Sequence, residues 1–325
     1  MSGSPDTVRA ALLRIGALLI SLVLASVVVF VVLRLLPGDA AGATLGVGTT
    51  TDQLDQLRSE LGTDQPVVTQ YVQWLGQIVR GDLGTSFVSR LPVADLIAQK
   101  LPITVPLSLS AFVLAVLVSV PLGVIAAVHR RGPVGVAVSA VSQLGVAVPV
   151  FWVGVLLVLV FALQAGVLPA GGFPRTGWDD PAAAVRSLVL PVVTVAIAMS
   201  AVMVRYVRSA TLDVLDQDYL RTARSLGYGR WRALARHGLR NAAVPVVSIL
   251  GIELATSLLG AVVIENVFAL PGLGTLLLDS VTSRDLPVVQ ALVLGLTAIV
   301  LVMNAVVDLG QRAIDPRLRT TEVAA

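Results

Sequence analysis

Long runs of apolar residues alternate with polar segments along this chain. Six of the runs approach or exceed the roughly 20 residues that an α-helix needs to cross a bilayer. They cover residues 15–33, 103–128, 134–163, 188–204, 244–264 and 287–307, and the fourth is the shortest. Several runs contain proline, which neighbouring helices make tolerable within a bundle; these residues are Pro106, Pro121, Pro149 and Pro191. The pattern predicts an all-α integral membrane protein with six transmembrane helices.

The composition agrees with this prediction. Hydrophobic residues make up 56% of the chain and charged residues 13%, whereas soluble domains carry about 25% charged residues. The first run lacks a small-residue cleavage site, so we expect a retained helix rather than a signal peptide. The chain has no cysteine, which excludes disulfides, thiol catalysis and cysteine metal sites. Its two histidines, His129 and His237, are too few for a histidine metal cluster.

Basic residues between the runs predict the orientation, because cytoplasmic loops of membrane proteins are enriched in them. One side of the predicted bundle carries Arg9, Arg14, Arg130, Arg131, Arg205, Arg208, Arg221, Arg224, Arg230, Arg232, Arg236, Arg240, Arg312, Arg317 and Arg319. We therefore expect both termini in the cytoplasm. The expected division is a cytoplasmic N-terminus with the first helix (1–36), an extracytoplasmic loop region (37–100), a core of five helices (101–314) that contains a cytoplasmic loop (205–243), and a cytoplasmic tail (315–325).

Residues 213–245, the arginine-rich segment, lie between the fourth and fifth apolar runs. Asp213, Asp216 and Asp218 precede Arg221 and Arg224, an order of charges that suits the dipole of a short helix. Gly227 follows where a left-handed residue commonly ends a helix. Helical spacing of apolar residues predicts a second helix from Arg230 to Pro245, where the next span begins. The segment is thus predicted to form helix, glycine turn and helix.

The residue order of this segment resembles the coupling loop of ABC importer permeases, and within it the peptide branch. The matching residues are Asp218, Tyr219, Leu220, Arg221, Thr222, Ala223, Arg224 and Gly227, followed by Arg236, His237, Leu239, Arg240, Asn241, Ala242 and Pro245. In that family the helix pair inserts into a groove of a cytoplasmic ATPase and transmits its closure. The resemblance implies ATPase coupling by Asp218, Tyr219, Arg221, Thr222, Ala223, Arg224, Gly227, Arg236, His237, Asn241 and Pro245.

Other segments extend the resemblance over nearly the whole chain, to the B-type permease of dipeptide and oligopeptide importers. They include residues 34–39, 61–66, 81–86, 149–152, 265–274 and 284–290. Gln311, Ala269 and Leu270 depart from the family pattern. The resemblance implies a role in the pathway or in receptor docking for Gly38, Asp39, Gly81, Asp82, Gly84, Ser86, Glu265, Phe268, Pro271, Gly272, Gly274 and Asp285. A turn at residues 271–274 also follows from proline and glycine alone.

Glu253 carries a carboxylate inside a predicted span, where ionisable residues are rare and commonly face a cavity or a partner. One interpretation places it on the pathway or against a second subunit. The other has it protonated and hydrogen-bonded to Thr256 or Ser257. The sequence leaves both open.

No phosphate-binding loop of the Gly-x-x-x-x-Gly-Lys-Ser/Thr type occurs, because the only lysine, Lys100, follows Gln99. No nucleophile–base set or paired catalytic carboxylates occur either. We expect no enzymatic activity, no metal and no cofactor on this chain, with ATP and Mg on partner subunits.

The resemblance implies the type I ABC importer permease fold and a subunit of an ATP-driven importer of oligopeptides or dipeptides, in a bacterial inner membrane. The expected partners are a homologous second permease, two cytoplasmic ATPase subunits or domains, an extracytoplasmic substrate-binding protein and membrane lipid, but no nucleic acid. One alternative is the same class with nickel, glutathione or another solute. Another is a secondary transporter with Glu253 as proton carrier, although no inverted repeat is visible.

Overall fold

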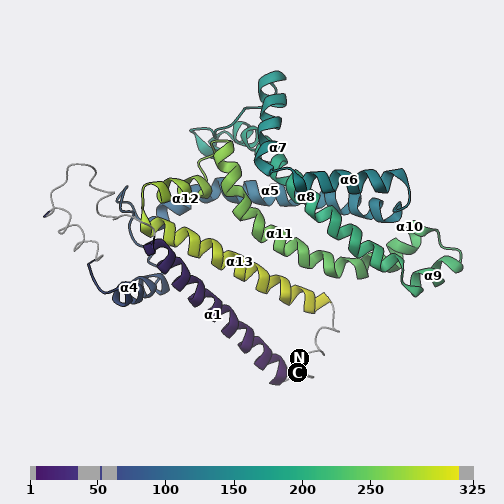
Figure 1. Cartoon of the computed structure of the whole chain (residues 1–325), viewed down its shortest axis with the longest axis horizontal. Helices are drawn as coiled ribbons and strands as arrows, with labels where there is room; N and C mark the ends of the chain where they lie inside the picture. Colours follow the sequence, from purple (N-terminus) through teal and green to yellow (C-terminus); the bar gives the residue numbers. More distant parts are fainter. Residues whose placement is uncertain (1–4, 36–51, 53–63, 315–325) are drawn as a thin grey trace. The chain divides into compact units, whose positions relative to one another are not determined.

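The computed structural model describes residues 5–35, 52 and 64–314, and these residues are helical or irregular apart from one isolated antiparallel bridge between Thr85 and Pro92. The α-helices are α1 (Pro5–Leu35), α4 (Val67–Val79), α5 (Val93–Val128), α6 (Pro133–Ala147), α7 (Val150–Leu157), α8 (Pro181–Leu215), α9 (Asp218–Ser225), α10 (Arg230–Ala233), α11 (Leu239–Val267), α12 (Leu273–Thr282) and α13 (Leu286–Ile314). Two π-helical segments cover Val158–Gln164 and Leu234–Gly238, and a short 3₁₀ turn covers Gly177–Asp179. Figure 1 labels the α-helices along the chain.

Five of the described helices are long and apolar enough to cross a membrane, or six if one bent pair counts as a single span. They include α1, α5, α11 and α13, which confirm four of the predicted runs as helices. The fourth run was predicted too short, because α8 extends through 35 residues. Its start is defined locally, since the Asp180 side chain accepts a hydrogen bond from the Ala183 N–H and Pro181 occupies the first turn.

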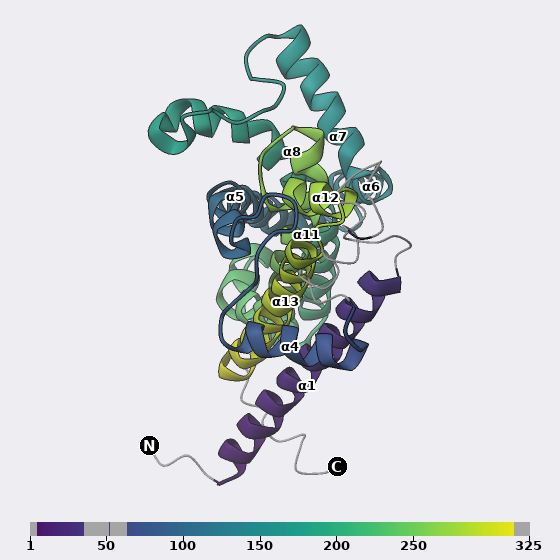
Figure 2. The same ribbon diagram turned by 90° about the vertical axis from the view of Figure 1, so that its left-hand side faces the viewer.

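The third run does not form the single continuous helix that its length predicted. It is broken into α6 and α7, which continues into the first π-helical segment, and the two parts are bent by 100°. Val148 is extended, with φ −85° and ψ 125°, immediately before Pro149. Proline disfavours the α conformation in the residue before it and has no N–H to continue the helix. Figure 2 shows α6 nearly end-on while α7 rises in the plane of the view.

The chain divides into two compact units. Of the described residues, the larger unit comprises 103–271 and 303–314. In it α8 packs against α11, α6 and α7. Its core contains Leu107, Met203, Ile264, Phe268 and Leu270, all nearly inaccessible to solvent.

The smaller unit comprises the described residues up to 102 together with residues 272–302. Its core includes Val93, Leu273, Val288 and Leu292. In this unit α4 lies against α1 through aromatic side chains. The Phe30 ring centroid lies 5.4 Å from that of Tyr71 and 5.7 Å from that of Trp74. The Tyr71 hydroxyl also forms a 2.9 Å hydrogen bond with the Ser26 hydroxyl.

Candidate functional site

The arginine-rich segment begins where α8 ends and forms the predicted helix, glycine turn and helix. Gln217 is extended, α9 starts at Asp218, and Gly227 beyond its end has φ +91°. This is the left-handed conformation expected at Gly227. Among the three aspartates, only Asp218 precedes the arginines at the front of a helix: Asp213 lies in the last turn of α8 and Asp216 is its C-terminal cap. The prediction for Asp213 and Asp216 was wrong because α8 continues well beyond its apolar run.

The second helix starts at Arg230 as predicted, but it does not end at Pro245. It passes from α10 through the second π-helical segment directly into α11, and Pro245 lies inside α11. Proline removes one backbone donor, and packing within a bundle tolerates that loss in a long helix. The arginine-rich segment is therefore continuous with the following span.

α9 has one buried and one exposed face. Leu220 and Ala223, three residues apart, are buried in a cluster with Val128 of α5, Val214 of α8 and Ala242 of α11. The exposed residues of α9 are Asp218, Tyr219, Arg221, Thr222, Arg224 and Ser225. Spacing of three or four residues places side chains on the same side of a helix. A short apolar stripe thus attaches α9 to the ends of three long helices, and its polar face is available to a partner.

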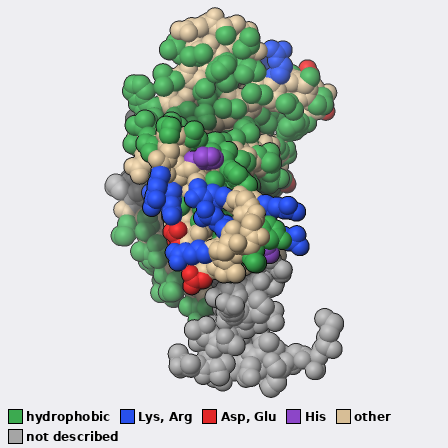
Figure 3. All heavy atoms as spheres, turned by 90° about the vertical axis from the view of Figure 1, so that its right-hand side faces the viewer, with side chains coloured by type: hydrophobic (Ala, Val, Ile, Leu, Met, Phe, Trp, Pro, Cys, Tyr) green, Lys and Arg blue, Asp and Glu red, His purple; other side chains and the backbone are tan. Residues whose placement is uncertain are grey.

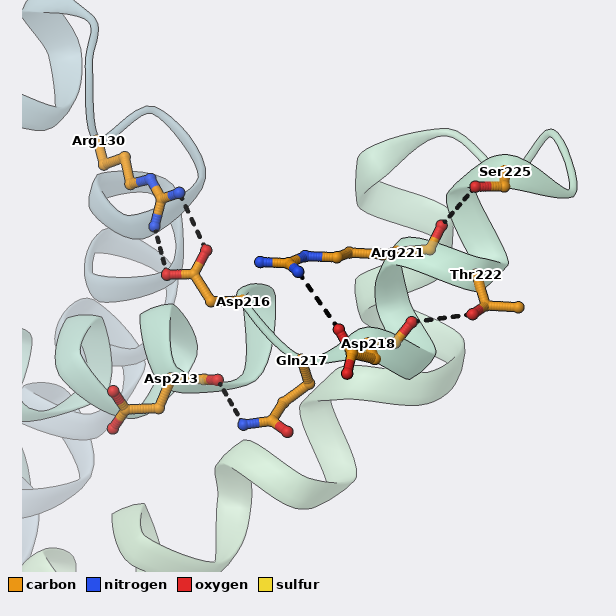
Figure 4. Close-up of polar contacts among 8 residues, drawn as sticks. All are labelled: Arg130, Asp213, Asp216, Gln217, Asp218, Arg221, Thr222 and Ser225. Carbon is orange, nitrogen blue, oxygen red and sulfur yellow. Dashed lines mark hydrogen bonds and ion pairs between the residues drawn. The ribbon is translucent and has the colours of Figure 1, made fainter.

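Hydrogen bonds within α9 stabilise its first turns (Figure 4). The Arg221 guanidinium donates to the Asp218 carboxylate at 3.3 Å, and the Thr222 hydroxyl donates to the Asp218 carbonyl oxygen at 3.0 Å. The Ser225 hydroxyl donates to the Arg221 carbonyl oxygen at 3.1 Å. The Arg221–Asp218 pair is largely exposed, so solvent screening limits its contribution to stability.

An ion pair that sequence analysis missed ties the turn after α5 to the end of α8. Both terminal nitrogens of Arg130 donate to the Asp216 carboxylate, at 2.9 and 3.0 Å. This contact raises the pKa of Arg130 and lowers the pKa of Asp216. Because the Asp216 pKa is lowered, the contact contributes above the usual carboxyl pKa and is lost as pH falls through the lowered value. The two residues are 86 positions apart, so the periodicity of the sequence gives no indication that they form a pair.

The start of α10 is attached to the same turn. The Arg230 guanidinium donates to the Val128 carbonyl oxygen at 2.7 Å. The Trp231 ring lies 6.0 Å from that of His129. The last carbonyl groups of a helix lack partners within it, so Arg230 satisfies one of those of α5.

Several predicted coupling residues contact one another. The Asn241 amide donates to the Tyr219 hydroxyl at 3.0 Å, which joins α11 to α9. The His237 ring packs edge-on against Tyr228 at 6.0 Å between centroids, and the Arg232 guanidinium lies 5.6 Å above Tyr228. Arg236 and Pro245 are exposed. Figure 3 shows Lys and Arg side chains gathered on the face of the molecule that it views.

Among the candidate outer residues, Ser86 and Asp285 meet in the smaller unit although 199 residues separate them. The Ser86 hydroxyl and the Phe87 N–H, the latter at 2.9 Å, both donate to the buried Asp285 carboxylate. The loop before them turns at Gly81 and Gly84, which have φ +82° and +81°. The Asp82 carboxylate accepts a 2.8 Å hydrogen bond from the Gly84 N–H.

We expect Asp285→Ala to lower the free energy of unfolding by about 3 kcal/mol, because the buried Ser86 hydroxyl and the half-buried Phe87 N–H lose a charged acceptor. Thermal denaturation of the purified chain in detergent measures the effect. Asp279→Ala is the matched control, because it removes a carboxylate from the exposed side of α12. It should leave the unfolding temperature almost unchanged. Equal transitions for the two variants would contradict a structural role for Asp285.

Glu265 and Phe268 are also candidates for the pathway or for receptor docking. Both are buried in the larger unit. The Thr104 hydroxyl donates to the Glu265 carboxylate at 2.5 Å. The Phe268 side chain is 1% exposed, and its carbonyl oxygen accepts a 2.7 Å hydrogen bond from Gly172. Pro271 is exposed, whereas Gly272 and Gly274 are buried. Gly38 and Asp39 lie outside the described residues, and receptor docking by this set stays a prediction.

Glu253 lies half-buried in α11. The Thr256 hydroxyl donates to the Glu253 carbonyl oxygen at 3.1 Å, and the Ser257 hydroxyl donates to the Leu254 carbonyl oxygen at 2.7 Å. Both hydroxyl protons therefore go to the backbone rather than to the Glu253 carboxylate. A role on the pathway or against a second subunit stays a prediction.

Comparison with known protein families decides the class of this chain. Residues 119–320 match the family described as the binding-protein-dependent transport system inner membrane component. Residues 8–108 match the N-terminal model of such membrane components. The chain belongs to this family. It is a permease subunit of an ATP-driven ABC importer, which decides against a secondary transporter.

Named relatives of the permease align over almost their full length. A putative peptide transport system permease protein of Brucella abortus (strain 2308) is 39% identical over 94% of this chain and 97% of its own. A glutathione transport system permease protein of Escherichia coli O6:H1 is also 39% identical, over the same shares. An oligopeptide transport system permease protein of Bacillus subtilis is 37% identical over 89% of this chain and 92% of its own.

Solved structures confirm the fold of the permease. A crystal structure of an amino acid ABC transporter has a TM-score of 0.53 at 20% identity and covers 68% of this chain and 94% of its own. The MetNI methionine ABC transporter in an inward-facing conformation has a TM-score of 0.54 at 18% identity. The match covers 68% of this chain and 96% of its own. The permease is therefore a multi-pass, all-helical membrane protein with the type I importer fold.

Proposed function

We propose that this permease imports short peptides and that the arginine-rich segment couples it to ATP hydrolysis. In this proposal it pairs with a homologous but distinct permease subunit, two ATPase subunits or domains dock in the cytoplasm, and an extracytoplasmic binding protein delivers the substrate. ATP and Mg are bound by the ATPases. The permease itself hydrolyses nothing, since its sequence has no phosphate-binding loop.

The observation that carries the coupling proposal is the two-faced structure of α9. Its exposed face presents Asp218, Tyr219, Arg221, Thr222 and Arg224, a mixture of charge and hydroxyl groups that suits a polar groove. Its buried face lies in one cluster with Val128, Val214 and Ala242, at the ends of α5, α8 and α11. A push on the exposed face therefore reaches three long helices through packed side chains. Closely packed interiors transmit such displacements because they are nearly incompressible.

The names of the relatives support peptides as the cargo. The Brucella and Bacillus relatives are named for peptide and oligopeptide transport. A peptide presents backbone amides and two charged ends whatever its side chains, and a receptor can bind these features. The permease then needs only a wide and weakly binding path, since tight binding within it slows release.

Glutathione is a second candidate, because the Escherichia coli relative named for it is as similar as the Brucella protein. Glutathione is a short peptide with one side-chain amide link, so the two candidates share most of their chemistry. Competition between glutathione and an α-linked tripeptide for uptake distinguishes them.

Deleting the gene for this permease should abolish ATP-dependent uptake of labelled peptides of a few residues, while free amino acids still enter. The deletion should also confer resistance to toxic peptide analogues that need this route. Restoring the gene on a plasmid is the control. Normal peptide uptake together with loss of nickel, glutathione or another solute would contradict the peptide assignment and leave the importer class intact.

The proposed orientation places both termini and the arginine-rich segment in the cytoplasm. In this cysteine-free chain, Thr176→Cys should react with an impermeant thiol reagent from outside intact cells. Ser225→Cys should react only after the membrane is opened. Both residues are exposed, so burial does not explain a failure to react. Labelling of position 225 from outside would overturn the orientation and the ATPase docking.

A further inference from the structure

A pocket of about 190 Å³ lies beside α9 in the larger unit. Four guanidinium groups line it, those of Arg130, Arg221, Arg224 and Arg230, against the single carboxylate of Asp216. Arg221 also pairs with the Asp218 carboxylate at 3.3 Å, so these groups together carry an excess of two positive charges. An anion is therefore the ligand that this pocket would bind.

Two of the four arginines are oriented by other contacts and keep free N–H donors. Arg130 is oriented by its two hydrogen bonds to Asp216, and Arg230 by one bond to the Val128 carbonyl oxygen. Arg221 extends across the pocket toward the Arg130–Asp216 pair (Figure 4). Each guanidinium carries five N–H donors in a rigid planar fork that matches the oxygens of a phosphate. The two preoriented guanidinium groups lose little side-chain entropy on binding.

The position of the pocket indicates where the phosphate comes from. Ala127 contributes to its wall and lies at the end of the apolar run of α5, and Arg130 follows three residues later. Basic groups within the first turn beyond an apolar span lie at the level of the lipid headgroups. The exposed ring of Trp231 in the same segment is of the kind enriched at that level.

We propose that this pocket binds the phosphodiester headgroup of an anionic phospholipid. The bound headgroup would join α9, through Arg221 and Arg224, to the turn after α5 and the start of α10, through Arg130 and Arg230. This inference goes beyond the proposed function and does not depend on the cargo. It makes the attachment of α9 to the spans sensitive to the lipid around the permease.

The test uses the assembled transporter, purified in detergent and titrated with phosphatidylglycerol, phosphatidylcholine or inorganic phosphate. Native mass spectrometry counts the retained molecules. The pocket variant Arg221→Gln/Arg224→Gln removes two lining charges without touching Arg130 or Arg230. The matched control Arg232→Gln/Arg236→Gln removes two charges from the same segment outside the lining. Arg221→Lys/Arg224→Lys keeps the charge.

The wild type and the matched control should retain phosphatidylglycerol over phosphatidylcholine. The lysine variant should bind phosphatidylglycerol more weakly than the wild type but more tightly than the pocket variant, because it keeps the charge and loses the planar fork. The pocket variant should bind phosphatidylglycerol about tenfold more weakly or worse, since each basic group near a lipid surface contributes about 1 kcal/mol. If the double glutamine variant fails to assemble, Arg224→Gln alone should give a weaker loss in the same direction.

Three results would overturn the proposal. One is equal phosphatidylglycerol binding by the pocket and control variants. Another is inorganic phosphate that displaces phosphatidylglycerol at equal concentration, which would make the pocket a simple phosphate site. The last is a pocket variant that keeps the lipid but releases the ATPase subunits, which would leave Arg221 and Arg224 with the ATPase docking of the proposed function and no role in lipid binding.

Discussion

Gly227→Leu should reduce ATP-dependent uptake about tenfold or more while the protein still inserts into the membrane. Gly227 has φ +91°, and a side chain in left-handed backbone costs roughly 1–2 kcal/mol. No heavy atom lies within 4 Å of the position of an added Cβ, so the cost arises from the backbone and not from a clash within the chain. The turn then shifts, and α9 presents its polar face at a different angle. Uptake of a labelled tripeptide by cells with matched permease levels measures the effect.

Two variants separate backbone strain from added bulk at this turn. Gly229→Leu is the matched control, because it adds the same side chain where φ is −61° and the surroundings are equally open, and it should transport normally. Gly227→Asn should retain much of the activity, since asparagine tolerates left-handed backbone better than leucine. Normal uptake by the leucine variant would show that this turn takes no part in coupling.

Phe268→Ala should lower the free energy of unfolding by about 3 kcal/mol or more, as removal of a buried aromatic ring leaves a cavity. The ring lies in the core of the larger unit, where a Cβ added at Gly154 would contact it at 3.1 Å. The Phe268 carbonyl oxygen also approaches Gly171 so closely that a Cβ there would lie 2.4 Å away. Thermal denaturation of the purified permease in detergent measures the loss.

Phe151→Ala is the matched control for this prediction, because Phe151 in α7 is 44% exposed. It should change the transition temperature much less than Phe268→Ala. Unchanged stability of the Phe268 variant with weakened binding of the receptor would instead support the docking role that the family resemblance implies.

Local sequence predicted the features that depend on neighbouring residues. Apolar runs of sufficient length predicted α1, α5, α11 and α13, since each must satisfy its backbone hydrogen bonds internally within a bilayer. The positive φ of Gly227 followed from its place after a short helix. The break at Pro149 was also encoded locally, because proline restricts the residue before it, but tolerance of proline in membrane bundles led to the wrong prediction there.

The sequence alone thus determined the membrane class, the helical elements, the likeness to importer permeases and the helix–glycine–helix order of the arginine-rich segment. Tertiary structure decided which distant groups meet. The Asp285 carboxylate accepts a hydrogen bond from Ser86, which is 199 residues away in the sequence. The Asp216 carboxylate pairs with Arg130, which is 86 residues away. It also decided that Ala223 faces inward while Arg224 beside it is exposed. Periodicity reports only contacts within one helix, whereas these pairings depend on how separate helices pack, and no local pattern records that.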